Sequence, residues 1–354
     1  MNDASPAPSQ ISARSVIPRH GETPAADRLK LRTLIPLPVA TAIALGVHLF
    51  IFRNEPIAPA LADTASLMPW VEKQAYLLLL GGILVASLGA AAVQPVWAGL
   101  RRWMLGMCPI LAATFVLLSA WEIVTAGLQL LPMPYFPGPA AVLQSLVGDR
   151  AMVFDSTWHS LLLLIGGYSL GVLTGVITGV CIGWFAPARY WGMPVLKVVG
   201  PIPATAWIPL ALVISPNAMI SATGLIALAV WFPVTMLTAS GISNTRASYL
   251  DVARTLGASR SYLIFRVAIP AAMPSIFIGL FMGLGASFLT LVVAETVGVK
   301  SGLGWYLSWA QGWAEYGKVY GALVIMAAFF STIMTVLFKV RDRVLVWQKG
   351  TIKW

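Results

Sequence analysis

Uninterrupted apolar runs recur along this chain, and they constrain its fold more than any other feature. Many of these runs reach about 20 residues, the length at which a helix crosses the hydrocarbon core of a bilayer. The chain of 354 residues is 58% hydrophobic and only 10% charged, as expected for many such spans. A transmembrane β-barrel would show short segments of alternating polarity instead. The sequence therefore predicts an all-α polytopic membrane protein.

We expect about eight spans from the positions and lengths of the apolar runs. An even number of spans would place both ends of the chain on the same side of the membrane. The expected spans are 34–52, 75–99, 104–126, 158–185, 194–214, 219–241, 268–293 and 318–340.

Basic residues are concentrated in alternate loops, which together hold 18 of the 23 Lys and Arg residues. By the positive-inside rule these loops face the cytoplasm, so we expect both termini and the loop 245–266 to be cytoplasmic. Membrane topology also explains the net charge of +10. Because basic residues do not interleave with exposed aromatic residues, we do not expect nucleic-acid binding.

The sequence divides into parts of different composition. A polar tail rich in Pro, Ser and Ala opens the chain and lacks the early apolar region of a signal peptide, so we expect it to be flexible. Arg101 and Arg102 then separate two spans from a continuous block of six. The predicted parts are a tail at 1–33, two extra transmembrane helices at 34–100, the six-span core at 104–345 and a cytoplasmic tail at 346–354.

The stretch "LDVARTLGASRSYLIFRVAIP", residues 250–270, lies between two apolar runs and predicts a helical hairpin. Ser248–Leu256 has the pattern of a short polar helix, Gly257 permits a left-handed turn, and Ser259–Phe265 begins a second helix that continues into the next span. A rigid protrusion of this kind can dock a soluble partner. The alternative is an ordinary basic inner loop.

Five glycines recur at every fourth position of the fourth span and form one stripe along the helix. Small residues at this spacing allow another backbone to approach closely. We therefore expect another helix to pack tightly against this stripe. A second interpretation is that the stripe lets neighbouring helices slide during a transport cycle, and both interpretations can hold. The glycines are Gly167, Gly171, Gly175, Gly179 and Gly183.

The segment "VGPIPATAWIPLALVISPNAMI" predicts a broken span, because each proline removes a backbone donor. Broken helices persist at membrane depth where they line a cavity or are buried in protein. The alternative is a loop that leads into a short span. The pathway-lining candidates are Pro201, Pro203, Trp207, Pro209 and the more distant Glu295.

Two carboxylates, Glu122 and Glu295, lie near the expected outer ends of two spans. An acid inside a membrane indicates a functional site, but near an interface it can reach water or bond to the backbone. A structural role is the favoured interpretation of both, and we expect no proton relay. Between the spans, "FPGPAAVLQSL" predicts a short helix at the outer surface, and "SGLGWYLSWAQGWAEYG" predicts an interfacial aromatic helix.

Catalytic, metal-binding and ATP-binding patterns are not found in the sequence. In "TVGVKS", Val299 occupies the position where a phosphate-binding loop needs its second glycine. ATP used by this protein would therefore be bound by a partner. No histidine lies in a metal-ligand pattern, and both cysteines lie in apolar runs, where an inert role is expected. These residues are His20, His48, His159, Cys108 and Cys181.

At residues 250–276, "LDVARTLGASRSYLIFRVAIPAAMPSI" resembles the EAA loop of permease subunits in binding-protein-dependent ABC importers. Asp251–Ala253 stand where that family has Glu-Ala-Ala, and Gly257 and Ala258 match its glycine and following alanine. The resemblance covers about 104–345, and "FPGPAAVLQSL", "VGPIPATAWIPLALV", "VVAET" and "SGLGW" are similar to segments of the nitrate, sulfonate and taurine branch. The ATPase-coupling residues that it implies are Asp251, Ala253, Arg254, Gly257, Ala258 and Arg260.

The resemblance implies a complete importer in a bacterial inner membrane. Two permease subunits, identical or different, would form the pathway, an ATP-binding cassette ATPase dimer would lie beneath, and a substrate-binding protein would dock outside. ATP and Mg would be bound by the ATPase, with no cofactor in this chain. The solute would be small and anionic, of nitrate, sulfonate or taurine type. The alternative, a secondary transporter driven by an ion gradient, would call for an inverted repeat and ionisable residues at the midplane, and neither is evident in the sequence.

Overall fold

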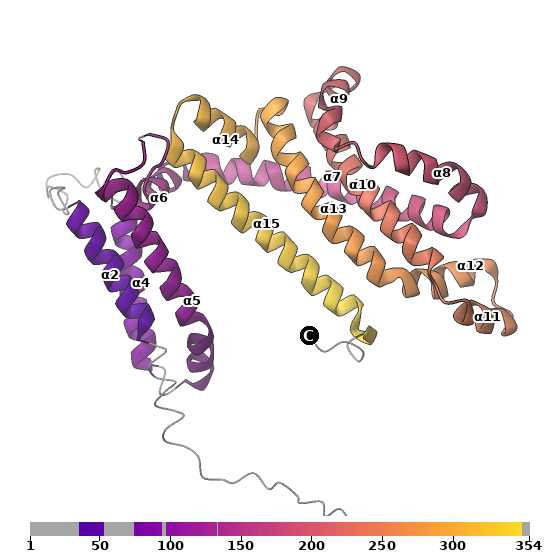
Figure 1. Ribbon diagram of the computed structural model, residues 1–354, viewed down its shortest axis with the longest axis horizontal. Coiled ribbons are helices and arrows are strands. Elements are labelled where there is room, and N and C mark those ends of the chain that lie inside the picture. Colours follow the sequence, from indigo (N-terminus) through magenta and orange to yellow (C-terminus); the bar gives the residue numbers. More distant parts are fainter. Residues whose placement is uncertain (1–34, 53–73, 94–96, 133, 349–354) are drawn as a thin grey trace, which may run out of the picture. The chain divides into compact units, whose positions relative to one another are not determined.

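The computed structural model describes residues 35–52, 74–93, 97–132 and 134–348, and within them every regular element is a helix (Figure 1). The all-α prediction is confirmed for these residues. The α-helices are α2 (Pro36–Ile51), α4 (Ala75–Val93), α5 (Ala98–Glu122), α6 (Pro139–Gly148), α7 (Arg150–Trp184), α8 (Ala186–Val199), α9 (Ile208–Ile214), α10 (Ala218–Ser243), α11 (Ala247–Thr255), α12 (Arg260–Tyr262), α13 (Ile269–Val297), α14 (Leu303–Gly312) and α15 (Tyr316–Val344). Four short π or 3-10 segments complete the set, η2 (Ile123–Gly127), η3 (Ala204–Trp207), η4 (Leu263–Ala268) and η5 (Val346–Gln348).

Six continuous helical segments of the described chain are long and apolar enough to cross a membrane. The seventh candidate is a bent pair, Ala186–Val199 with Ala204–Ile214, whose two halves meet at 85°. The predicted break in this span is therefore present. The sequence predicted about eight spans, and the structure supports six, or seven with the bent pair, among the described residues. The remaining predicted span is 34–52, where α2 has 16 residues, fewer than the roughly 20 of a full span.

The described helices fall into two compact units, and the chain passes from the first to the second between Ile123 and Val124. The first unit contains α2, nearly all of α4, and α5; the second contains the helices from α6 onward. The sequence placed a division at Arg101 and Arg102, before the third span. In the structure both arginines lie inside α5, and α5 packs along α2, so the compact units do not follow that boundary.

In the second unit, α10 lies between α7 and α13 and contacts both along much of its length. All five glycines of the α7 stripe are buried against α10. A Cβ at Gly175 would come within 2.9 Å of the Val234 side chain, and one at Gly179 within 2.6 Å of Thr238. Because side chains are absent on the stripe, the two helices lie backbone to backbone.

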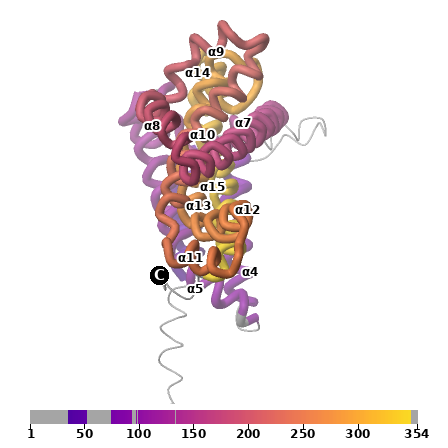
Figure 2. Tube along the Cα trace, turned by 90° about the vertical axis from the view of Figure 1, so that its right-hand side faces the viewer, coloured from indigo at the N-terminus to yellow at the C-terminus, as the bar shows by residue number. Residues whose placement is uncertain are grey.

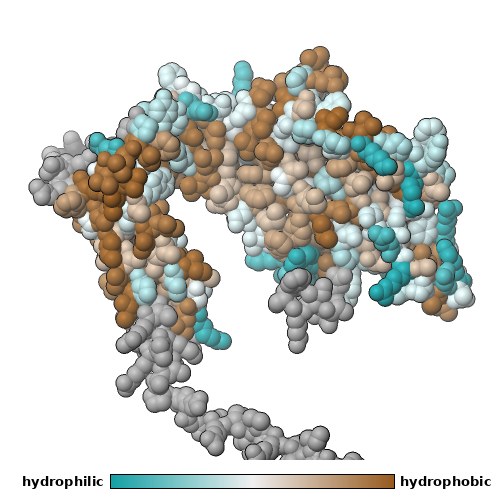
Figure 3. All heavy atoms as spheres, viewed as in Figure 1, coloured by the Kyte–Doolittle hydropathy of each residue, from teal (hydrophilic) through white to brown (hydrophobic). Residues whose placement is uncertain are grey.

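The two ends of the second unit differ in what they present. The α11–α12 hairpin lies at one end, and α9 and α14 lie at the other, as both views show (Figures 1 and 2). Hydrophilic residues gather near the hairpin end, whereas the flanks of the spanning helices are largely apolar (Figure 3). The hairpin joins α10 to α13.

Candidate functional site

The hairpin between α10 and α13 is closed by a complete helix C-cap. Gly257 has φ +81°, a left-handed conformation that glycine adopts without steric cost. Its N–H donates to the Arg254 carbonyl at 2.9 Å, and the N–H of Ala258 donates to the Ala253 carbonyl at 3.0 Å. This pair of bonds is the Schellman motif, so α11 ends at a fixed angle.

The second arm of the hairpin is anchored to its neighbours. The hydroxyl of Ser259 accepts a hydrogen bond from the N–H of Tyr262 at 3.3 Å and caps α12. The guanidinium of Arg260 lies 5.0 Å from the centre of the Phe185 ring, which connects α7 to α8. From α12 the chain continues through η4 into α13, as predicted. The hairpin is therefore rigid at its turn and continuous with a spanning helix.

Large apolar side chains of the hairpin are exposed. None of the residues of α11 is buried, and Leu256 at its end is 82% exposed. Tyr249, Val252 and Leu256 border a groove of about 590 Å³ that also contains the Gly257 turn. On a polar hairpin, such an apolar cluster indicates a docking surface. Leu256 was not singled out from the sequence, although an apolar residue directly before the turn glycine of a polar hairpin could have indicated it.

The predicted coupling residues all lie on this hairpin, but they do not form one contact group. Asp251 accepts a hydrogen bond from Arg254 at 3.0 Å on the exposed face of α11. Ala253 and Ala258 are joined by the C-cap, and with Gly257 they border the groove. Arg260 points to Phe185 instead.

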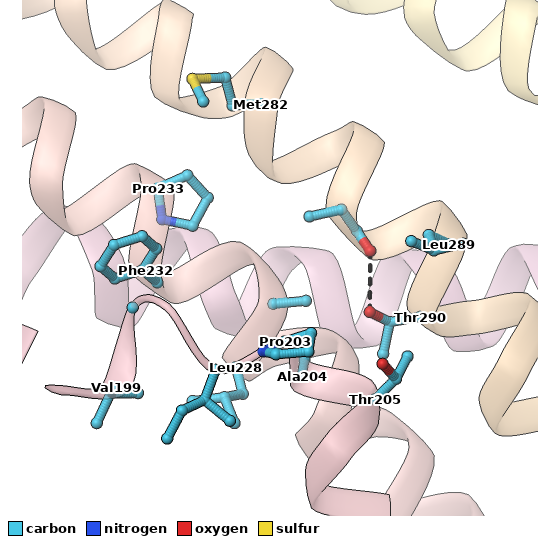
Figure 4. A pocket seen from close by; sticks show the side chains of 14 residues that line it. Val199, Pro203, Ala204, Thr205, Leu228, Phe232, Pro233, Met282, Leu289 and Thr290 are labelled. Carbon is cyan, nitrogen blue, oxygen red and sulfur yellow. Dashed lines mark hydrogen bonds between the residues drawn. The ribbon is translucent and has the colours of Figure 1, made fainter.

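A second groove, of about 280 Å³, lies where the broken span meets the central parts of α10 and α13 (Figure 4). The break at Gly200–Pro203 approaches α10 so closely that a Cβ on Gly200 would overlap the Phe232 ring. Irregular backbone within a spanning segment is tolerated where it lines a cavity, and the break at Gly200–Pro203 lines this groove. The lining residues are Val199, Gly200, Ile202, Pro203, Ala204, Thr205, Leu228, Ala229, Phe232, Pro233, Met282, Ala286, Leu289 and Thr290.

Of the five pathway-lining candidates, only Pro203 borders this groove. Pro201 and Pro209 lie on either side of it in the chain, in the break and in the first turn of α9. The indole N–H of Trp207 is buried and has no hydrogen-bond partner in the described structure. The sequence did not single out Thr205 or Thr290, because isolated threonines in apolar runs give no distinctive pattern.

Glu295 lies in α13, apart from the groove, in a network that joins three helices. It is 1% exposed, and its carboxylate accepts hydrogen bonds from the Ser160 hydroxyl at 2.6 Å and the Gly304 N–H at 2.8 Å. Ser160 also accepts a bond from the N–H of Leu303 at 2.8 Å. The carboxylate therefore caps the first turn of α14 and ties it to α7 and α13.

The "SGLGW" segment closes over this carboxylate. Gly302 has φ +106°, and a Cβ there would overlap the carboxyl group of Glu295. A Cβ on Gly304 would overlap the carbonyl of Val292. Two segments that resembled family members separately, "VVAET" and "SGLGW", are thus one structural unit.

Glu122 has an ionisable partner that the sequence did not reveal. In the first unit, His48 Nδ1 lies 2.6 Å from the Glu122 carboxylate oxygen Oε1, joining α2 to α5. Glu122 is 0% exposed, and its other oxygen, Oε2, has no partner in the described structure. The sequence did not indicate this partner of His48, because Glu122 lies 74 residues away in the chain.

Tyr306 is also placed differently from its expected position at an interface. It is fully buried, and its hydroxyl donates to Asp149 at 3.0 Å. Burial, and next the hydrogen bond to Asp149, raise the pKa of Tyr306 above the ordinary value of tyrosine. Lys318 forms an ion pair with the same Asp149 at 2.9 Å, so this cluster fixes one end of α14 and α15. The aromatic residues expected on the interfacial helix were Trp305, Tyr306, Trp309 and Trp313. Of these four, only Trp313 is strongly exposed, at 70%.

The sequence of this chain matches a known protein family and several of its members. Residues 171–345 match the family described as binding-protein-dependent transport system inner membrane component. A probable ABC transporter permease protein of Haemophilus influenzae is 32% identical, over 52% of this chain and 74% of its own length. The taurine transport system permease protein TauC of Escherichia coli is 30% identical over 51% and 68%. The nitrate import permease protein NrtB of Synechococcus elongatus is 28% identical over 53% and 70%.

Proposed function

The chain belongs to the family of binding-protein-dependent transport system inner membrane components, and on this basis we propose how it works within an ABC importer. Membership confirms the resemblance seen in the sequence and does not favour a carrier driven by an ion gradient. The chain is a permease subunit, so energy enters through a partner.

We propose that the α11–α12 hairpin is the docking site of the ATPase. One observation carries this assignment: a rigid hairpin with exposed apolar residues joins α10 to α13, the two long helices that line the central groove. Displacement of the hairpin by an ATPase would therefore move two walls of the groove together. Such a movement can alternate access to a solute site.

The charge of the hairpin supports a cytoplasmic position. Arg246, Arg254, Arg260 and Arg266 lie in or beside it, as the positive-inside rule expects for a cytoplasmic segment. ATP and Mg would then be bound by the ATPase below the hairpin. The opposite end of the unit, with α9 and α14, would face the substrate-binding protein.

We propose that the solute passes along the central groove, with a second permease subunit completing the pathway. The relatives are named for taurine and nitrate, which are small solutes with an anionic group or charge. This chain would take a solute of that size. The apolar flanks of the spanning helices would face lipid and the second subunit.

Replacement of Leu256 by Ser tests the ATPase assignment. The side chain is 82% exposed, so its loss should leave folding intact while it weakens the docking surface. We expect less ATPase to copurify with the Leu256→Ser permease in mild detergent, and lower ATP-dependent uptake in proteoliposomes. Trp313→Ser is the matched control, because Trp313 is 70% exposed on the segment after α14, at the opposite end. Equal ATPase recovery with both variants would contradict the assignment.

A further inference from the structure

The first turn of α14 is attached to two helices at once. The N–H of Leu303 donates to the hydroxyl of Ser160 on α7, at 2.8 Å. The N–H of Gly304 donates to the carboxylate of Glu295 on α13, also at 2.8 Å, and the Ser160 hydroxyl donates to the other Glu295 oxygen at 2.6 Å. Ser160 and Glu295 are almost completely buried, so water does not compete for these bonds. A shift of α14 therefore pulls on α7, on α13 or on both.

The chain itself joins α13 to α14 less firmly than these bonds do. The connection is the stretch 298–302, with Gly298 at one end and Gly302 at the other. Glycine has the widest choice of backbone conformations, so this connection alone could bend. The bond between Gly304 and Glu295 bypasses it and holds the start of α14 directly on α13.

The other end of α14 is braced as well. Lys318 forms ion pairs with Asp149 at 2.9 Å and with Glu315 at 2.6 Å. Its Nζ also lies 5.0 Å from the centre of the Trp309 ring on α14. Beside this cluster, residues 311–315 are exposed, at the end of the unit opposite to the hairpin (Figures 1 and 2). A contact made there is therefore carried along a short, firmly held helix to its first turn.

Of the two helices that hold this first turn, only α13 lines the central groove. The lining residues include Met282, Ala286, Leu289 and Thr290 of α13, and the described lining contains no residue of α7. Thr290 lies within about two helical turns of Glu295. A displacement of α14 therefore reaches the groove most directly through Glu295.

We propose that Glu295 is a positioning residue that couples α14 to the wall of the central groove. A substrate-binding protein that docks at this end of the unit presses on α14, and the bond between Gly304 and Glu295 passes the displacement to α13. Because α13 is continuous with η4 and the hairpin, the same displacement reaches the side of the ATPase. This inference rests on the proposed position of the substrate-binding protein.

ATP hydrolysis by the complete transporter in nanodiscs tests the proposal. The rate is measured without the binding protein and then with binding protein incubated with taurine or nitrate, the solutes for which two relatives are named. Glu295→Met keeps the length of the side chain but removes the acceptor of Gly304. We expect an unchanged basal rate and a stimulation by the binding protein that falls at least about five-fold, the lower end of usual coupling between sites.

Ser160→Ala is the matched control. This variant and Glu295→Met each remove two hydrogen bonds, and both lose the bond between Ser160 and Glu295. Ser160→Ala keeps the bond between Glu295 and Gly304, so the stimulation should be retained even where thermal unfolding shows an equal loss of stability. Glu295→Gln keeps an acceptor oxygen for Gly304 and should also retain it. A merely structural role would lower the stimulation in step with stability in all three variants.

A distance measurement leaves the network intact. Spin labels are attached at Gln311 of α14 and Ile278 of α13, which are both exposed, in a chain whose two cysteines are replaced by Ser. The distance between the labels should stay the same when the binding protein stimulates hydrolysis, because α14 and α13 move together. A change in this distance overturns the inference.

The possible outcomes of the hydrolysis assay are distinct. A loss of stimulation confined to Glu295→Met supports the inference. Normal stimulation of Glu295→Met, or an equal loss in Glu295→Met and Ser160→Ala, overturns the inference and leaves the importer function standing. A wild-type transporter whose ATP hydrolysis does not respond to the binding protein with either solute overturns the proposed function, and the inference with it.

Discussion

Two buried carboxylates, one in each compact unit, show how differently similar residues are held. Glu122 and Glu295 both lie near the ends of long apolar helices, and both are almost completely buried. Glu295 receives its hydrogen bonds from neutral groups, a hydroxyl and a backbone N–H. Glu122 faces the ionisable ring of His48 and keeps one oxygen without a partner in the described structure.

The difference lies in whether the partners can be replaced. A backbone N–H is present whatever the side chain, so the turn at Gly304 needs an acceptor from elsewhere. The His48 ring is a side chain, and it can be removed together with its partner. Glu295 therefore completes the fold of α14, whereas the contact of Glu122 with His48 is one of several ways in which α2 could be joined to α5.

Replacement of Glu295 by Ala should have the largest effect. It leaves the N–H of Gly304 and the hydroxyl of Ser160 buried without their acceptor, and it opens a cavity. We expect a loss of about 3–5 kcal/mol in the free energy of unfolding. Thermal unfolding of the purified protein in nanodiscs measures it. Glu295→Gln keeps one acceptor oxygen and should lose less; an equal loss in both variants would contradict the role of the acceptor.

Replacement of Gly302 by Ala should be the next in size. The residue has φ +106°, and the added Cβ would overlap the Glu295 carboxyl group. Strain at this angle and displacement of the carboxylate together should cost about 2–3 kcal/mol. Gly312→Ala is the control, because that glycine lies at the other end of α14 with open space around it. Comparable unfolding temperatures of the two variants would show that α14 begins without this contact.

The glycines of this chain show which structural features could be predicted from the sequence and which could not. The cap at Gly257, the packing stripe on α7 and the break near Pro201 follow from local rules on glycine and proline, so they could be predicted. The contact between Glu295 and "SGLGW" depends on tertiary folding, although both segments had been singled out. The role of Gly302 therefore became apparent only when the two segments were seen together.

The first unit was harder to predict for the same physical reason. His48 and Glu122 come together across 74 residues, and apolar runs contain no signal for which helices pair. The arginines at 101 and 102 were interpreted as a division between parts of the chain, yet a helix tolerates both, and α5 runs through them to pack on α2. Thr205 and Thr290 were not singled out, because only the folded structure brings them together in the wall of the central groove.

Replacement of both His48 and Glu122 by Leu tests the other side of the comparison. Loss of His48 alone leaves a buried carboxylate without its partner, and we expect it to cost about 3 kcal/mol. The double variant removes both polar groups and fills the space with apolar atoms, so its stability should lie within about 1 kcal/mol of wild type. Unfolding of the two single variants and the double variant in nanodiscs measures the coupling. A double variant as unstable as His48→Leu would give Glu122 a role of the same kind as Glu295.

The smallest effect on stability is expected at an ion pair that lies outside both buried sites. Asp251 and Arg254 are 3.0 Å apart on α11, but their side chains are 62% and 57% exposed, so water already compensates each charge. Asp251→Asn should change the free energy of unfolding by less than about 0.5 kcal/mol. The same variant should lower the recovery of ATPase, since it alters the face proposed to dock there. Copurification and thermal unfolding of one preparation separate the two effects. If stability fell as far as it does with Glu295→Ala, burial would not be what distinguishes the carboxylates of this protein; if neither quantity changed, the docking face would exclude Asp251.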